Sequence, residues 1–174
     1  MFPFGHVGIG THLIPRAARE RLPWRWLALG CLLPDLLDKP IWLAAQWLGV
    51  ELPKLESARL FGHTAWFALA FVVAARLSGA RHLAALAYAI PTHLVLDIVT
   101  DWGRGGGWGV WERWLFWPLA IPRLHLLALG VMGVSPLQEL GTELHMRVNL
   151  AGELLGAALL LWDFAKARRR SADR

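Results

Sequence analysis

The 174-residue sequence contains one cysteine, Cys31, and this scarcity limits the chemistry that is open to the protein. A single thiol cannot form a disulfide within the chain or build a zinc site from several thiolates. Any metal site must therefore use histidine and carboxylate ligands. No serine stands in the strained turn that presents a serine nucleophile, so a serine hydrolase is not expected.

Charged residues are also scarce: they make up 18% of the chain, whereas a soluble domain carries about 25%. Hydrophobic residues reach 56% and the mean hydropathy is +0.41, which points to a membrane. An unbroken apolar span of about 20 residues is nevertheless missing. Long runs without Asp, Glu, Lys or Arg include 60–75, 82–96 and 124–138, and two of these contain His63 and His93. We therefore expect a compact bundle embedded in a bilayer or seated on it.

Strand-like alternation and internal repeats are scarce as well, so the sequence predicts one all-α domain over residues 1–174. The N-terminal segment lacks the basic and long apolar regions of a cleaved signal peptide. Helices are predicted at residues 5–19, 24–33, 40–50, 61–77, 82–100, 112–134 and 147–166.

Prolines are expected to make these helices short and broken. Pro34 is predicted to end one helix and Pro40 to begin the next, while Pro91 is predicted to kink the helix that contains it. Pro118 and Pro122 interrupt the segment 112–134, which favours a re-entrant or surface-lying segment over a full crossing.

Tryptophan and arginine are the residues that are plentiful. Five of the eleven tryptophans fall between Trp102 and Trp117, and indole rings prefer the boundary between membrane and water. The formal net charge of +5 comes mainly from arginines, which cluster at residues 16–25 and 166–170. Such basic flanks meet anionic lipid head groups. Because they flank apolar segments and do not line one face, no nucleic-acid partner is expected.

The stretch PTHLVLDIVTDWG places an ionisable pair, His93 and Asp97, in an otherwise apolar segment. Residues four apart lie on one face of a helix. The hairpin turn centres near Gly79 and Ala80, and His63 lies about as far before it as Asp97 lies after it. At about 1.5 Å of rise per residue, these groups should meet at one depth.

Asp35 follows a proline in an apolar run, and this is unusual for a solvated loop residue. Asp38 is expected to be a cap or a surface charge, because Lys39 and Pro40 follow it. A set of two histidines and two aspartates suits zinc or a similar divalent ion. The set predicted here is Asp35, His63, His93 and Asp97. The alternative is a structural His–Asp pair that joins two helices. An ion pathway is disfavoured, because only apolar residues continue along the hairpin toward its basic turn.

The segments LLPDLLDKP, ARLFGHT, PTHLVLDIVTDWG and LFWPL, in this order, resemble the YdjM-like, LexA-regulated inner-membrane-associated metal-dependent hydrolases. That family is distantly similar to the zinc-dependent phospholipase C and nuclease superfamily. Ala58 stands where relatives often have histidine, and the second acid of the Pro-Asp motif is displaced to Asp38. The matched positions are Gly5, His6, Pro34, Asp35, Arg59, His63, Thr64, His93, Asp97, Thr100, Trp117 and Pro118.

The resemblance implies a multi-pass protein of the inner membrane that binds a divalent metal, with zinc expected. The implied metal ligands are His6, Asp35, His63, His93 and Asp97. Catalytic roles are predicted for Asp35, His93, Asp97 and Glu153. Glu153 would act as a general base or ligand, or would instead bond a neighbouring helix.

Arg59 is expected to hold a phosphate or an acid partner, and Arg104 to hold an anionic group near the tryptophan cluster. Together these features predict a membrane-bound hydrolase that cleaves a phosphoester of a lipid or lipid-linked substrate, with a metal lowering the pKa of a bound water. The alternative is a non-catalytic membrane protein whose His/Asp cluster is structural or senses a metal.

Overall fold

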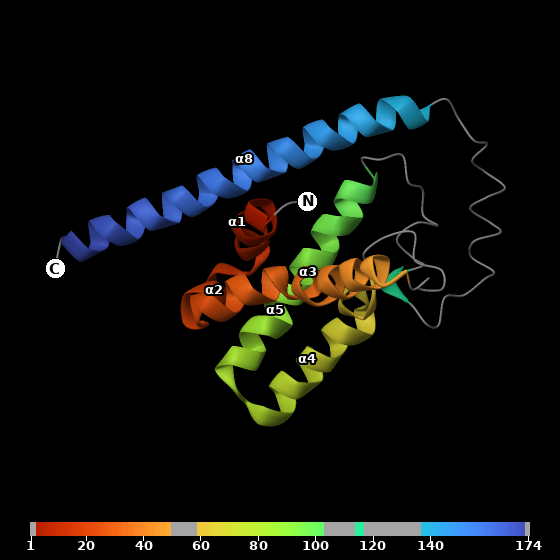
Figure 1. Cartoon of the computed structure of the whole chain (residues 1–174). Helices are drawn as coiled ribbons and strands as arrows, with labels where there is room; N and C mark the ends of the chain where they lie inside the picture. The colour runs from red at the N-terminus through yellow and green to blue at the C-terminus, as the bar shows by residue number, and fades with distance from the viewer. Residues whose placement is uncertain (1–2, 50–58, 103–113, 117–136, 173–174) are drawn as a thin grey trace.

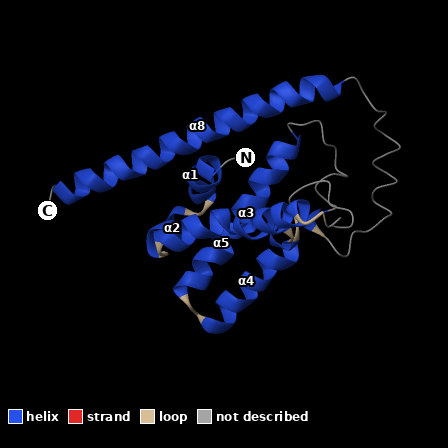
Figure 2. Cartoon of the chain, viewed as in Figure 1, coloured by secondary structure: helices blue, strands red, loops and turns tan. Residues whose placement is uncertain are grey.

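Figure 1 presents a computed structural model of the chain, which describes residues 3–49, 59–102, 114–116 and 137–172. Within these ranges the backbone is helical and contains no strand (Figure 2). The all-α prediction is therefore confirmed. The segment predicted to be re-entrant, 112–134, lies almost wholly outside the described residues.

The N-terminal half begins with α1 (Pro3–Leu13) and α2 (Arg16–Arg21), followed by the long helix α3 (Trp24–Trp47). The prediction that Pro34 ends one helix and Pro40 begins another is wrong, because both lie inside α3. Each proline removes one backbone hydrogen bond. Pro34 is buried where α3 packs against its neighbours, and this packing can offset the lost bond.

A helical hairpin follows, formed by α4 (Ala65–Ser78) and α5 (Arg81–Trp102). The helix predicted at 61–77 is in fact a 3₁₀ turn (Phe61–His63) followed by α4. The Thr64 hydroxyl separates the two by accepting a hydrogen bond from the Phe67 amide, which caps α4. His63 therefore sits before the helix, at the end of the hairpin remote from its turn.

Helix α5 is the centre of the bundle, since α1, α3 and α4 all pack against it. One apolar cluster joins Leu86, Ile90 and Leu94 of α5 to Phe67 of α4 and to Trp114. A second cluster joins Ala85 and Ala89 of α5 to Ile14, Leu27 and Cys31. Any polar residue on the inner faces of α5 is consequently removed from solvent.

The last helix, α8 (Leu137–Ala172), extends beyond the predicted range 147–166 at both ends. It runs along one side of the bundle and packs mainly against α1 (Figure 1). Among the residues that the structure describes, two segments are long and apolar enough to cross a membrane, judged by length and composition alone: Arg81–Asp101 and Met146–Arg169.

The α1–α8 contact depends on a close approach of Gly8 and Gly156. A Cβ atom at Gly8 would overlap the Gly156 carbonyl oxygen, and one at Gly156 would overlap the Phe4 carbonyl oxygen. We expect Gly156→Ala to separate the helices and to cost about 1–3 kcal/mol in unfolding free energy. Denaturation in detergent, followed by circular dichroism, measures this cost. Ala151→Ser, on the exposed face of α8, is the control, and equal stability of the two variants would contradict the prediction.

Candidate metal centre

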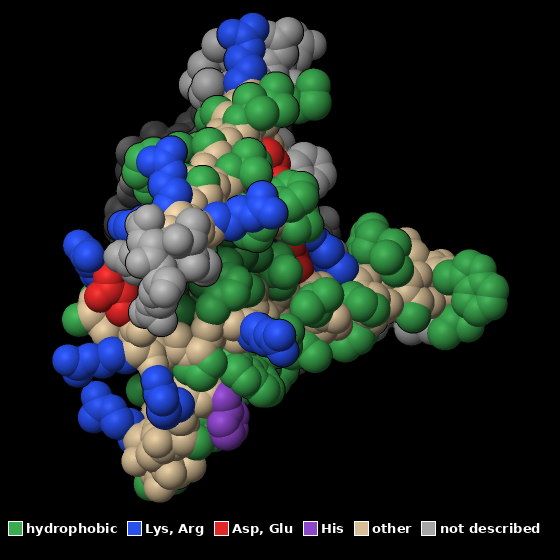
Figure 3. Space-filling model, turned by 90° about the vertical axis from the view of Figure 1, so that its left-hand side faces the viewer, with side chains coloured by type: hydrophobic (Ala, Val, Ile, Leu, Met, Phe, Trp, Pro, Cys, Tyr) green, Lys and Arg blue, Asp and Glu red, His purple; other side chains and the backbone are tan. Residues whose placement is uncertain are grey.

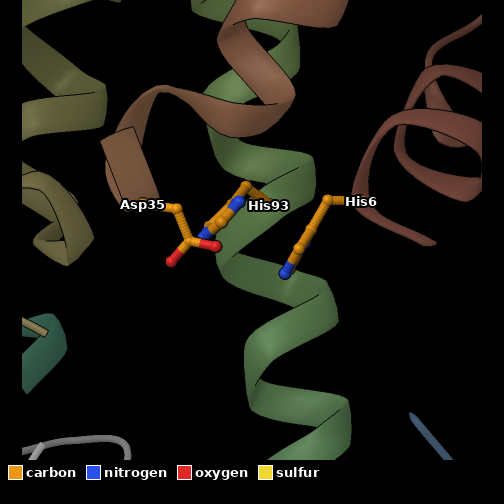
Figure 4. Close-up of side chains that lie close together, drawn as sticks. All are labelled: His6, Asp35 and His93. Carbon is orange, nitrogen blue, oxygen red and sulfur yellow. The ribbon is translucent and has the colours of Figure 1, made fainter. Parts of the chain in front are cut away.

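Five polar side chains from four helical segments converge inside the bundle. His6 comes from α1, Asp35 from α3, His63 from the 3₁₀ turn, and His93 and Asp97 from α5. In Figure 4 the side chains of His6, Asp35 and His93 point toward one another from three helices. The meeting of His63, His93 and Asp97 follows the register predicted for the hairpin.

The distances between ligand atoms suit a small divalent ion. His63 Nε2 lies 3.2 Å from His93 Nε2, 3.4 Å from Asp97 Oδ2 and 3.5 Å from Asp35 Oδ1. His93 Nε2 lies 3.7 Å from Asp97 Oδ2. Ligands at about 2.0–2.2 Å from one ion lie about 3.3–3.6 Å apart at the corners of a tetrahedron. These four distances are close to the edge lengths of a tetrahedral site, and the cluster contains two possible ligand triads that share His93: His6–Asp35–His93 and His63–His93–Asp97.

The other ring nitrogens fix how these two histidines face the centre. His93 Nδ1 donates to the Cys31 carbonyl oxygen at 2.7 Å, and His63 Nδ1 donates to Asp38 Oδ2 at 2.7 Å. Because both partners are acceptors, the protons lie on the Nδ1 atoms. Each Nε2 then turns a lone pair inward, and two lone pairs facing each other favour a cation or a proton between them.

Asp38 is the functional residue that the sequence analysis placed incorrectly. It is 1% exposed and is neither a helix cap nor a surface charge. Its carboxylate accepts hydrogen bonds from the backbone amides of Leu60, Gly62 and His63 as well as from the His63 ring. It thus builds the 3₁₀ turn and orients a candidate ligand. The i to i+3 spacing from Asp35 was the available signal, because it turns both acids toward neighbouring parts of one helix surface.

Arg59 and Asp101 form a second layer around Asp97. The Arg59 guanidinium donates to Asp97 Oδ2 at 3.1 Å and also to Asp101, and it lies over the Trp114 ring. Of its two predicted roles, the structure places Arg59 as an acid partner. Asp101, one helical turn after Asp97, is buried and pairs with Arg59. The second predicted anion-binding residue, Arg104, lies outside the described residues.

The buried carboxylates around His63 favour a positive charge at the centre of the cluster. Burial opposes protonation of His63, yet hydrogen bonds to Asp35, Asp38 and Asp97 outweigh it and raise the His63 pKa to about 10. Burial and the charge of His93 lower the His6 pKa to about 3. The carboxylates thus favour a positive charge at His63 Nε2, which either a proton or a bound metal cation can supply, whereas His6 stays neutral, which is the form that ligates metals.

Glu153 is placed at the start of α1 and bonds a neighbouring helix, which was the alternative to its predicted catalytic role. Its two carboxylate oxygens accept hydrogen bonds from the Phe4 and Gly5 amides at 3.1 and 2.8 Å. It therefore fixes the turn that carries His6. His6 stacks on His93 at 4.0 Å between ring centroids, and its buried Nδ1 has no hydrogen-bond partner within the described part of the chain.

These observations define a class: an all-α protein with two candidate membrane spans among its described residues and a buried His/Asp cluster that could hold a metal ion. The chain belongs to the YdjM inner membrane protein family, which it matches over residues 1–169. Comparisons with curated proteins and with solved structures give no match. Membership of the family is as predicted, whereas the relationship to the zinc-dependent phospholipase C superfamily stays a prediction.

Proposed function

We propose that this protein is a metal-dependent hydrolase of the inner membrane and that it cleaves a phosphoester of a lipid or lipid-linked substrate. The observation that carries the proposal is the pair of inward-facing Nε2 atoms, 3.2 Å apart and flanked by two carboxylates. Asp35, His63, His93 and Asp97 would hold the ion, and zinc suits this mixed nitrogen and oxygen set. His6 is available as a fifth ligand.

A bound divalent ion would supply Lewis acidity and lower the pKa of a coordinated water. Neighbouring residues of the chain hold these ligands in position. Asp38 holds the His63 ring, the Cys31 carbonyl holds the His93 ring, and Arg59 keeps Asp97 ionised and oriented. A fixed second layer of this kind preserves ligand geometry while substrate binds.

Substrate would approach from the side of Asp35. The Asp35 side chain is 14% exposed, whereas those of His6, His63, His93 and Asp97 are at most 5% exposed. Beside it, the half-exposed Lys39 places its Nζ atom 2.6 Å from Asp35 Oδ2. An ammonium at the rim of a metal site can bind an anionic group of a substrate. Lys39 therefore supports a phosphoester as the bond that is cleaved.

A lipid substrate is supported by the apolar surface at the depth of the cluster. Val95 and Val99 of α5 flank Asp97 in sequence and are about half exposed. Trp66, near the start of α4, is also exposed, as expected for a residue at a membrane boundary. If the turn carrying Arg76 and Arg81 is cytoplasmic in a multi-pass arrangement, the cluster lies toward the outer side of the inner membrane.

The proposal predicts metal-dependent hydrolysis that is lost in Asp97→Asn. Purified protein in detergent, supplied with zinc, would be assayed on a phospholipid panel and on a soluble phosphodiester. We expect release of phosphate-containing product from lipid, with a decrease of about 100-fold or more in Asp97→Asn because one ligand loses its charge. Asp163→Asn, which alters the peripheral carboxylate 3.6 Å from His12, should keep full activity.

Turnover of the soluble ester alone would refute the lipid substrate and leave the hydrolase intact. The absence of turnover with every compound would favour the second candidate, a non-catalytic membrane protein with a structural or metal-sensing cluster. Deep burial of four of the five side chains is the observation that favours this candidate.

A further inference from the structure

The end of the bundle near the α4–α5 turn carries two apolar grooves on either side of Tyr88. One groove, of about 380 Å³, lies between α2 and α5. The other, of about 270 Å³, lies between α4 and α5. Proline, alanine and leucine line the first groove, and valine and alanine line the second. Each groove contains a single arginine, Arg21 in the first and Arg76 in the second. No candidate metal ligand lines either groove.

Positive charge is concentrated around these grooves. Six arginines lie in α2, at the start of α3 and at the hairpin turn: Arg16, Arg19, Arg21, Arg25, Arg76 and Arg81. The Arg81 guanidinium donates to the Arg21 carbonyl oxygen, which ties α5 to the end of α2. Residues 1–34 and 59–96 contain one acid, Glu20, and it pairs with Arg16 at 2.7 Å. The arginine charge at this end is therefore largely uncompensated within those segments.

One arginine nitrogen at this end also lacks an acceptor. Arg19 Nη1 is buried and has no hydrogen-bond partner in the part of the chain that the structure describes. A buried guanidinium N–H without an acceptor is costly. Arg19 lines neither groove, so it adds positive charge to this end of the bundle without contacting a ligand in the grooves. In Figure 3, Lys and Arg side chains stand beside apolar side chains on this face of the molecule.

The surrounding residues place this end at a membrane boundary. Trp24 and Trp26 are exposed beside the arginines, and the Trp26 ring lies 5.3 Å from the His82 ring. Tryptophan together with arginine is typical of the head-group layer. Tyr88 lies seven residues beyond Arg81, which is about 10 Å deeper along α5. The grooves therefore run from the arginines toward the depth of the acyl chains.

We propose that this end of the bundle is a binding site for an anionic phospholipid. The phosphate would lie near Arg21 and Arg76, which line the two grooves, and the two acyl chains would occupy the grooves that flank Tyr88. Charge complementarity selects an anionic lipid over a zwitterionic one, and two grooves match two chains. The site is separate from the His/Asp cluster and does not depend on hydrolase activity.

Lipid binding to the purified full chain in detergent, measured by native mass spectrometry, tests this inference. Phosphatidylglycerol should bind about tenfold or more tightly than phosphatidylcholine with the same chains. Arg21→Gln combined with Arg76→Gln should remove that preference. The control, Lys166→Gln combined with Arg169→Gln, removes the same charge from the exposed basic end of α8. No residue of α8 lines either groove, so those charges attract head groups without a groove for the acyl chains and the control should keep the preference.

A second variant, Ala84→Phe, retains every charge but fills the groove between α4 and α5, and it should also weaken phosphatidylglycerol binding by about tenfold. It serves as the deciding variant if the arginine pair does not fold, as judged by circular dichroism. Equal binding of the two lipids would overturn the proposal. The proposal would also be overturned if the arginine double variant and Ala84→Phe both bound phosphatidylglycerol as tightly as the wild type. The same holds if the α8 control lost the lipid preference to the same extent, or if equimolar inorganic phosphate displaced the lipid.

Discussion

Replacing His93 and Asp97 together with alanine is expected to reduce bound divalent metal from about one ion per chain to background. The two side chains supply two of the four closest ligand atoms, and His93 Nε2 lies 3.2 Å from His63 Nε2. His93 belongs to both ligand triads, His6–Asp35–His93 and His63–His93–Asp97, so neither triad remains complete. The expected loss is therefore close to complete.

Elemental analysis of protein purified without chelators and loaded with zinc measures this effect. The matched control replaces His12 and Asp163, a peripheral His–Asp pair whose charged atoms lie 3.6 Å apart. Because α5 is the central helix, the alanine pair also opens a cavity. His93→Gln combined with Asp97→Asn keeps the side-chain volume and should lose the metal as well. Equal zinc in wild type and in the volume-conserving variant would refute the metal centre.

Asp38→Asn is expected to have the largest effect on stability of any single polar replacement discussed for this chain. Its carboxylate accepts four hydrogen bonds, at 2.7 to 3.1 Å, from three backbone amides and the His63 ring. An asparagine amide would turn an N–H group toward some of these donors and leave them unsatisfied. The cost should be about 3 kcal/mol or more, because each buried unpaired donor costs about 1–3 kcal/mol.

The same variant should weaken zinc binding by about 10- to 100-fold, because the His63 ring loses the partner that orients it. Asp35→Asn is the informative comparison. Asp35 is partly exposed and is a candidate ligand, so its replacement should weaken metal binding while changing stability little. Unfolding in detergent and zinc titration separate the two outcomes. An Asp38→Asn protein with wild-type stability and zinc affinity would contradict the role assigned to Asp38.

The sequence was sufficient for the all-α class because that class depends on local patterns. Helical apolar periodicity is present within each segment and strand-like alternation is scarce, and both patterns can be recognised without knowing what the segment packs against. The hairpin register was accessible for the same reason: a tight turn near Gly79 fixes which residues of α4 and α5 stand at one depth. This is why His63, His93 and Asp97 could be grouped before their distances were known.

The predictions that Pro34 ends one helix and that Pro40 begins the next were wrong because they considered only the backbone hydrogen bond that each proline removes. Pro34 and Pro40 each weaken a helix, yet α3 continues through both while packed against α5 and the 3₁₀ turn. Tertiary packing of α3 offset the free energy that was lost with these backbone hydrogen bonds.

Roles of individual acids were decided only by tertiary structure. Asp38 and Glu153 each satisfy backbone amides of a segment at least 22 residues away, and no local pattern reveals such partners. Arg59 likewise meets Asp97 and Asp101 across a separation of at least 38 residues. The sequence by itself determined the helical class, the hairpin register and the kinds of ligand available. Which carboxylates face the centre, and which only hold its neighbours in place, depended on long-range packing, because burial is what forces each charged group to find a partner.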